Sequence, residues 1–174
     1  MVLFFPVVLT GADKKKPGSE KFWWGFQINN TLSYTGFSNA LLGVVSKNDF
    51  QLYAGPRLLT SDAYLPTEGP WGINSGVSWF FARGEKMHAK ANLDYQVVFL
   101  EPYNPHNLPE KGRNATHEFN ISYGFTYFFL QNFGVGNSIG FGRYLERFHD
   151  LQENVTRTYS GYSGLIRVHL HYSF

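Results

Sequence analysis

The sequence predicts an all-β protein, an antiparallel up-and-down transmembrane β-barrel of about eight strands. Strict alternation along the last nine residues is the first of three observations that predict this fold. The two faces carry Ile166, Val168, Leu170, Tyr172 and Phe174 on one side and Arg167, His169, His171 and Ser173 on the other. A period of two is that of a β-strand. Because a membrane barrel has lipid outside and a polar lumen, a polar face with an arginine and two histidines fits that architecture.

Composition is the second observation. Aromatic residues make up 18% of the 174 residues, whereas charged residues make up only 16%. No apolar run reaches the roughly 18 residues that a transmembrane helix needs, so the aromatic content fits the two girdles of a membrane barrel. The length suits one domain. A net charge of +2 gives no indication of nucleic-acid binding, and zero cysteines exclude a disulfide scaffold and cysteine-based zinc sites.

The alternation of short and long connections is the third observation. Short turns are expected at 47–49, 83–86 and 130–132, and long connections at 61–70, 100–115 and 148–158. A transmembrane barrel has short turns at its periplasmic end and longer loops outside. Aromatic residues gather near both ends of the expected strands, as two interfacial belts require. The connection Thr35–Asn39 is the exception, because it is short and lies at the loop end.

The N-terminus resembles an export signal. Residues 1–12 are expected to be a truncated signal peptide, with Val2–Leu9 as its apolar core and cleavage before Asp13. No lysine or arginine precedes this core, so a strand at Val2–Leu9 is the alternative. Residues 13–21 would then form a polar periplasmic lead-in, and residues 22–174 the barrel.

The first four expected strands are Phe22–Tyr34, Ala40–Ser46, Phe50–Thr60 and Trp71–Ala82. In the first, an apolar outward row runs from Trp24 to Tyr34 and is interrupted at Asn30. The second is short and weakly patterned. The third directs Tyr53 and Arg57 inward, and the fourth directs tryptophan and phenylalanine side chains outward.

The last four expected strands are Met87–Phe99, Thr116–Phe128, Phe133–Glu146 and Tyr159–Phe174. The fifth strand alternates most clearly, since every second residue from Met87 to Phe99 is apolar and the residues between are mostly polar. The seventh carries a row of inward glycines, which we expect to make room for bulky side chains such as Tyr53 or Tyr144.

The chain resembles the small eight-stranded outer-membrane β-barrel proteins of Gram-negative bacteria. The resemblance is carried by Tyr53-Ala54-Gly55-Pro56-Arg57-Leu58 and by the strand that ends in Phe174, and it covers the chain from about Phe22 onward. This C-terminal signature usually has glycine where the chain has His169. The resemblance implies an outer-membrane location among lipid and lipopolysaccharide. It does not imply a function, because this fold hosts pores, enzymes, adhesins and anchors.

The polar faces of the expected strands collect charged residues in the lumen. The inward set is Arg57, His88, Lys90, Asp94, Glu118, Glu146, Arg167, His169 and His171. Eight strands leave an interior that side chains about fill, and an unpaired buried charge is costly. The sequence therefore predicts a plug of salt bridges and hydrogen bonds. His169 and His171 have ligand-capable spacing, but no third ligand follows, so no metal or cofactor is predicted.

An enzyme that modifies lipid A is the first alternative function. Lipid A deacylases place a histidine two residues before Ser-Asn-Ala, whereas Gly36 stands at that position before Ser38-Asn39-Ala40. Without a base, Ser38 has no visible activator. His106 and His149 lie in expected outer loops and could serve a transferase. A small pore is a second alternative, and a soluble lipocalin-like ligand binder is a third.

The interpretation favoured by the sequence is a non-enzymatic barrel with a structural or surface-interaction role. Lys90 and Asp94 on the polar face of the fifth strand disfavour the lipocalin alternative, which needs an apolar interior. The outer connection 100–115 is the best candidate for contacts, and its candidate residues are Tyr103, His106, Lys111 and Arg113. Lipopolysaccharide, a larger envelope protein complex or a host surface would be the partner, and the sequence does not distinguish among them.

Overall fold

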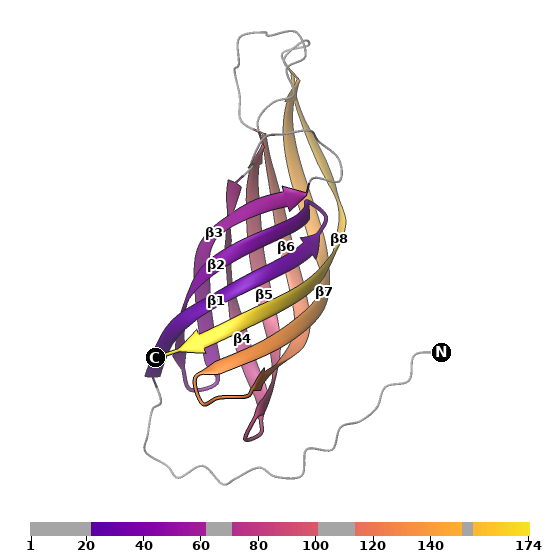
Figure 1. Cartoon of the computed structure of the whole chain (residues 1–174). Coiled ribbons are helices and arrows are strands. Elements are labelled where there is room, and N and C mark those ends of the chain that lie inside the picture. Colours follow the sequence, from indigo (N-terminus) through magenta and orange to yellow (C-terminus); the bar gives the residue numbers. More distant parts are fainter. Residues whose placement is uncertain (1–21, 62–70, 101–113, 151–154) are drawn as a thin grey trace, which may run out of the picture.

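The chain closes into a barrel of eight antiparallel strands, which confirms the predicted fold class (Figure 1). The computed structural model describes residues 22–61, 71–100, 114–150 and 155–174. Each strand pairs with the next, and the last pairs with the first. The strands are β1 (Phe22–Ser33), β2 (Gly36–Lys47), β3 (Phe50–Ser61), β4 (Trp71–Arg83), β5 (Met87–Leu100), β6 (Asn114–Phe128), β7 (Phe133–Asp150) and β8 (Val155–Ser173). Helices of a length and hydropathy suited to crossing a membrane are absent from these ranges.

The register of the strands sets their tilt. A row of paired residues leaves β1 at Phe22, passes around the barrel through Phe50, Ala91 and Ile139, and returns to β1 at Leu32, ten residues further along. With strands about 4.8 Å apart and a rise of about 3.3 Å per residue, this displacement gives a tilt of about 40° from the barrel axis. Transmembrane barrels have tilts of this size.

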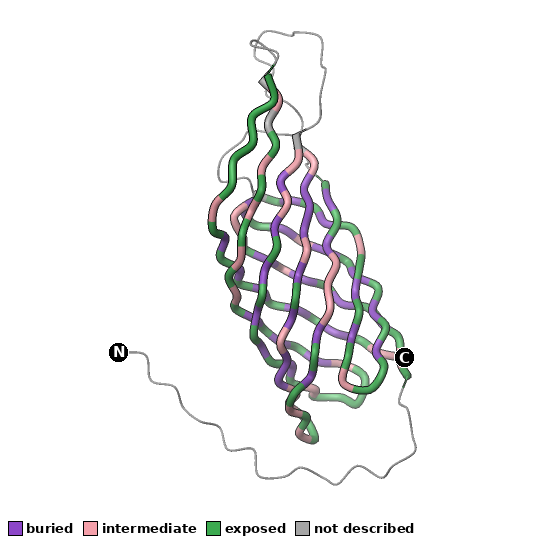
Figure 2. Tube along the Cα trace, turned by 180° about the vertical axis from the view of Figure 1, so that it is seen from behind, coloured by how far each residue is buried: buried purple, intermediate pink, exposed green. Residues whose placement is uncertain are grey.

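The two faces of the barrel differ sharply in residue type. Inward and outward residues alternate along each strand, as the alternating buried and exposed positions in Figure 2 show. The outer face carries large apolar side chains that are exposed, such as Leu93 at 55%, Ile121 at 58% and Phe141 at 72%. The buried inner face is mostly polar. This inversion of the soluble pattern is what a barrel in lipid requires.

Short connections join the strands at the end where both β1 begins and β8 ends (Figure 1). They consist of residues 48–49, 84–86 and 129–132. Asn48 has a φ of 55°, a left-handed conformation that asparagine tolerates better than most residues. Arg83 fixes this turn from the neighbouring strand, because its guanidinium lies 3.6 Å from the Asp49 carboxylate and donates to the Asn48 carbonyl. The three predicted short turns therefore lie at one end of the barrel.

β2 is longer than predicted and its pattern explains why. The expected strand Ala40–Ser46 extends in fact from Gly36 to Lys47. Its inward residues Leu42 and Val44 are buried in the lumen, while Leu41 and Val45 lie on the outer face. Because both faces are apolar here, no alternation marks the strand. Ala40, Leu42, Val44 and Tyr53 form an apolar cluster inside the barrel, with Trp23 against it.

The first connection at the loop end is tighter than predicted. β1 ends at Ser33, and only Tyr34 and Thr35 separate it from β2. The expected outward position of Tyr34 is wrong, because its ring stacks on Tyr144, an inward residue of β7, with centroids 3.6 Å apart. A two-residue turn ends the alternation, so the tyrosine folds over the barrel end instead of continuing the apolar row.

β7 and β8 extend beyond the other strands at the loop end, as Figure 1 shows. They run to Asp150 and from Val155, so the predicted loop 148–158 is largely strand, and the expected starts and ends of these strands are corrected accordingly. The polar residues Thr156, Arg157 and Thr158 hid this extension, since they show no apolar face. The expected signal peptide and lead-in, at 1–21, lie outside the described residues.

Candidate functional site

The lumen brings together most of the charged residues that the sequence placed inside. Seven of them have exposed fractions of 0–3%, namely Arg57, Lys90, Asp94, Glu118, Arg167, His169 and His171. His88 and Glu146 are half-buried nearer the two ends of the barrel. The alternation of each strand directs these side chains inward, so residues distant in the chain meet across the lumen.

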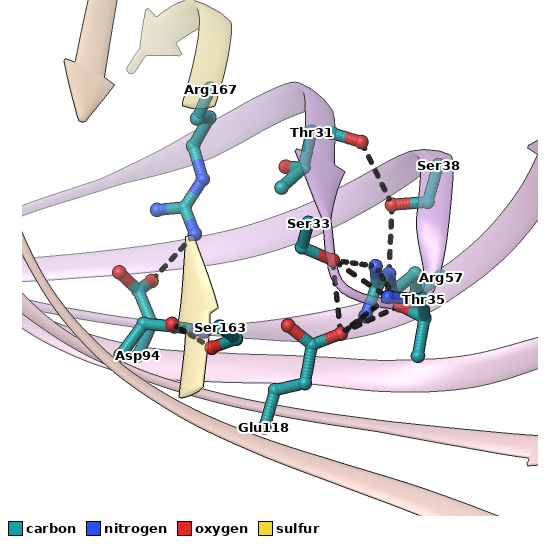
Figure 3. A network of polar contacts seen from close by, with 10 residues as sticks. Thr31, Ser33, Thr35, Ser38, Arg57, Asp94, Glu118, Ser163 and Arg167 are labelled. Carbon is teal, nitrogen blue, oxygen red and sulfur yellow. Dashed lines mark hydrogen bonds and ion pairs between the residues drawn. The ribbon is translucent and has the colours of Figure 1, made fainter. Parts of the chain in front are cut away.

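One cluster centres on Arg57 and Glu118, near the loop end (Figure 3). The guanidinium and the carboxylate lie 3.8 Å apart. Hydroxyl groups surround this ion pair. Arg57 donates hydrogen bonds to the hydroxyls of Ser33, Thr35 and Ser38 at 2.8–3.0 Å. Ser33 and Thr35 in turn donate to Glu118 at 2.9 and 2.6 Å. Charge-assisted hydrogen bonds of this kind offset the desolvation of a buried pair.

A second cluster centres on Asp94 and Arg167, deeper in the lumen (Figure 3). The Arg167 Nη2 and Asp94 Oδ1 atoms lie 2.8 Å apart. Tyr53 donates its hydroxyl hydrogen to the same carboxylate, and Ser122 donates to its other oxygen at 3.1 Å. Gly76 on β4 provides the space for the Tyr53 ring, since a Cβ there would overlap it. The glycine that accommodates Tyr53 therefore lies on β4 and not on β7.

Lys90 lies on the turn side of this second cluster without a carboxylate within 4 Å among the described residues. Its Nζ atom lies 3.4 Å from His169 Nε2, and Thr126 lies 2.9 Å from the same nitrogen. Gly136 of β7 makes room for the His169 ring, because a Cβ there would lie 2.5 Å from it. The lumen is thus paired at two levels and carries a third cation held mainly by hydrogen bonds.

Aromatic rings and two histidines line the lumen at the turn end. His171 contacts Trp23 edge-on at 4.9 Å, and His88 contacts Phe128 at 4.8 Å. Phe80 lies 5.8 Å from His88. A cavity of about 810 Å³ opens beneath these rings and is rimmed by the charged residues of the turns. His88 and His171 are therefore members of an aromatic layer and not of a salt-bridge network.

Glu146 lies at the opposite end, where β7 and β8 rise above the barrel. Tyr34 donates to its carboxylate at 3.2 Å while stacking on Tyr144. Burial, a hydrogen bond with Tyr144 and the negative charge of Glu146 together raise the pKa of Tyr34 above its ordinary range. The tyrosine is therefore a neutral hydrogen-bond donor that covers the loop end of the lumen.

Several members of these clusters were missed by the sequence reasoning. Thr35 and Ser38 lay in a predicted connection, where alternation gives no direction. Tyr53 was predicted inward, but its bond to Asp94 joins β3 to β5 past the strand between them, β4. The register and curvature of these strands decide this contact, and alternation alone does not indicate them. The outer-loop candidates Tyr103, His106, Lys111 and Arg113 lie outside the described residues.

The described surroundings of Ser38 do not resemble those of an activated nucleophile, and His106 lies outside the described residues. Ser38 is buried, accepts a hydrogen bond from Arg57 at 2.8 Å, and lies 3.3 Å from the Thr31 carbonyl to which it donates. An activated serine needs an adjacent base, and none contacts Ser38 in the described part of the chain. His149 lies at the loop end, 3.1 Å from the Thr156 hydroxyl. The described ranges contain no group of three or more side chains placed to hold a metal ion.

The fold and its two faces define a class, that of closed eight-stranded barrels with an apolar exterior and a mostly polar interior. Among solved structures, the chain is similar to the Neisserial surface protein A (NspA), with a TM-score of 0.54, 11% sequence identity, and coverage of 88% of this chain and 97% of that one. This likeness confirms the predicted resemblance at the level of the fold. No family model and no curated protein matches the sequence.

Proposed function

We propose that the protein is an outer-membrane barrel whose lumen is closed by its own side chains. Its role would be structural or would be exercised through its outer loops, without catalysis or conduction in the lumen. The observation that supports this proposal is the buried lumen network, in which two ion pairs at different depths occupy the cross-section. The similarity to a surface protein of known structure supports the fold on which the proposal rests.

Membrane insertion is tested by the response of the folded barrel to heat. A closed barrel leaves no strand edge and resists unfolding in SDS until it is heated. Protein extracted from outer-membrane fractions should therefore migrate differently on a gel before and after boiling. Identical migration, together with solubility in the absence of detergent, would contradict the proposal and favour the soluble ligand-binding barrel.

Closure of the lumen is tested by conductance in planar lipid bilayers. Because Arg57 pairs with Glu118 and Arg167 pairs with Asp94 across the barrel, the purified protein should form no stable channels. Ion-selective channels whose selectivity changes in Asp94→Asn would mean that the network moves aside, and a small pore would then be the better description.

The proposal that the protein does not modify lipid A is tested by the acyl composition of lipid A. Mass spectra of lipid A from cells with and without the protein should show the same acyl composition. Gain or loss of an acyl chain would establish the enzyme alternative, and His106→Ala and His149→Ala would then locate the base.

The outer connection that contains Tyr103, His106, Lys111 and Arg113 is the proposed contact region. Its support is its sequence, because Tyr103 and His106 lie among three prolines and the basic residues Lys111 and Arg113 follow the last of them. A photo-crosslinking residue at position 103 should capture lipopolysaccharide or an envelope protein in intact cells. The same residue at position 131, in a turn at the opposite end, is the control. Equal yields at both positions would contradict a contact region in this loop.

A further inference from the structure

The outer face of β6 and β7 carries basic residues at one level of the barrel, near the loop end. Arg143 and Arg147 of β7 are both on the outer face and exposed. His117 of β6 pairs with Leu145, the outward residue between the two arginines. Diagonal neighbours on a sheet face lie about 7–8 Å apart, within reach of long side chains. Three basic side chains from two strands therefore converge on one patch.

The height of this patch follows from the register. Phe133 begins the outward row of β7, and Arg143 lies ten residues further along. At a tilt of about 40° and a rise of about 3.3 Å per residue, this separation corresponds to about 25 Å along the barrel axis. The apolar band of a transmembrane barrel is about 25 Å tall. Arg143 consequently lies where hydrocarbon gives way to lipid headgroups, and Arg147 lies within the headgroup layer.

The patch carries positive charge that its neighbours leave uncompensated. The outward residues opposite Arg143 and Arg147 are Phe119 and Ala115 on β6 and Tyr162 and Thr158 on β8, and none is acidic. Neither arginine has a carboxylate within 4 Å in the described ranges. This differs from the lumen, where each buried arginine faces a carboxylate.

Two contacts hold the patch in place. The Arg143 guanidinium lies over the Tyr162 ring at 5.7 Å from its centroid, and this ring is 84% exposed. His117 Nδ1 lies 2.8 Å from the Tyr95 hydroxyl, which orients the imidazole. An arginine stacked on an aromatic face loses less freedom when it binds a planar or tetrahedral anion.

We propose that Arg143, Arg147 and His117 bind the phosphate groups of a phosphorylated glycolipid in the outer leaflet, the class to which lipid A belongs. This inference rests on the proposed outer-membrane location. Guanidinium groups bind phosphate through paired, charge-assisted hydrogen bonds. The acyl chains of such a lipid would lie against the apolar surface below the patch, where Phe119 and Phe141 are exposed by 53% and 72%.

The test uses the full chain folded in zwitterionic detergent micelles, with heat-dependent gel migration as the check of folding. Native mass spectrometry measures retention of diphosphorylated lipid A, of its dephosphorylated derivative and of phosphatidylglycerol. The expected result is selective retention of the diphosphorylated form. Arg143→Gln and Arg147→Gln should each weaken it about fivefold, since each basic residue near a lipid surface contributes about 1 kcal/mol. Lys86→Gln, which removes an exposed charge at the turn end, should leave retention unchanged.

The conservative double variant R143K/R147K distinguishes the effect of the guanidinium shape on lipid retention from the effect of the positive charge. It keeps both positive charges but loses the guanidinium fork, so retention should fall below that of the native chain. Equal retention of the two lipid A forms, or equal retention of phosphatidylglycerol, would overturn the inference. A chain that fails to fold in micelles would instead contradict the proposed membrane location, so the two failures are distinguishable.

Discussion

At the scale of the residue, the lumen shows how charge is tolerated inside a narrow barrel. Asp94 is nearly inaccessible, yet it contacts Arg167, Tyr53 and Ser122. Lys90 is equally buried, but its polar neighbour is a histidine and no carboxylate. Removing one partner of a buried pair leaves the other charge uncompensated. Removing a charge that has no partner instead takes away a destabilising buried charge. The two residues should therefore respond to neutral substitutions in opposite directions.

The substitution Asp94→Asn should lower the midpoint of unfolding in denaturant. It leaves Arg167 without its counter-ion, at a cost below the maximum of about 3–5 kcal/mol for a broken buried pair, because a polar lumen admits water. Lys90→Met is the matched comparison and should leave the midpoint unchanged or raise it. Urea titrations followed by tryptophan fluorescence measure both. A loss of stability in Lys90→Met equal to that in Asp94→Asn would contradict the assigned pairing.

Adjacent residues of β5 should also report opposite environments. Leu93 is 55% exposed on the outer face, whereas Asp94 is buried in the lumen. A spin label at position 93 should be quenched by oxygen dissolved in lipid, and a label at 94 should be protected. Leu93→Arg should destabilise the barrel by about 2–4 kcal/mol near the bilayer midplane. The reverse quenching pattern would show that the register of β5 is shifted by one residue.

At the scale of the element, the bounds of a strand are predicted best where one face is polar and the other is apolar. β5 was predicted with nearly its true bounds, because its inner residues are charged or amide-bearing and its outer residues apolar. β2 was underestimated, because Leu42 and Val44 are buried inside and Leu41 and Val45 face outward. The Arg57 cluster could be predicted only in part. Its charges follow from alternation, but Thr35 reaches it through a two-residue turn that the sequence does not mark.

The apolar cluster on β2 leads to a prediction that would not hold if the interior of the barrel were polar throughout. Leu42 is fully buried inside the barrel, and its neighbour Leu41 is 52% exposed outside. Leu42→Ala should destabilise by about 2–5 kcal/mol, because it leaves a cavity among packed side chains. Leu41→Ala is the control and should cost far less. Unfolding in guanidinium chloride measures both, and equal losses would mean that the interior of the barrel is not packed at this level.

At the scale of the whole molecule, the fold depends on the seam between β1 and β8. The two strands pair from Gly25 and Ser173 to Leu32 and Ile166. On the outer face, Trp24 stacks on Phe174 with centroids 4.3 Å apart, and Phe26 packs edge-on against the same ring at 5.8 Å. The Phe174 amide donates to the Trp24 carbonyl at 2.9 Å. The terminal phenylalanine therefore joins the first strand to the last.

The substitution Phe174→Ala should reduce the fraction of chains that close. It removes aromatic pairs worth about 0.5–1.5 kcal/mol each beyond their buried area. Refolding into micelles, scored by the heat-sensitive gel band, should be slower and less complete. Phe129→Ala is the control, because Phe129 is also an exposed aromatic residue at the turn end but its ring packs on Phe133 of β7 and not on Trp24 or Phe26 of β1. An equal loss in both variants would indicate a general interfacial effect.

The position of the seam also has a consequence for biosynthesis. Because the first strand finds its partner only in the last, the barrel cannot close while the chain is still emerging from a ribosome or a translocon. Until β8 pairs with β1, a sheet formed by the earlier strands keeps two unpaired edges, and these favour pairing with other copies. A chain bound for the outer membrane, as proposed above, must be kept apart from its neighbours until β8 arrives. On that proposal, its yield in cells should be limited by the supply of periplasmic holding chaperones rather than by the stability of the finished barrel.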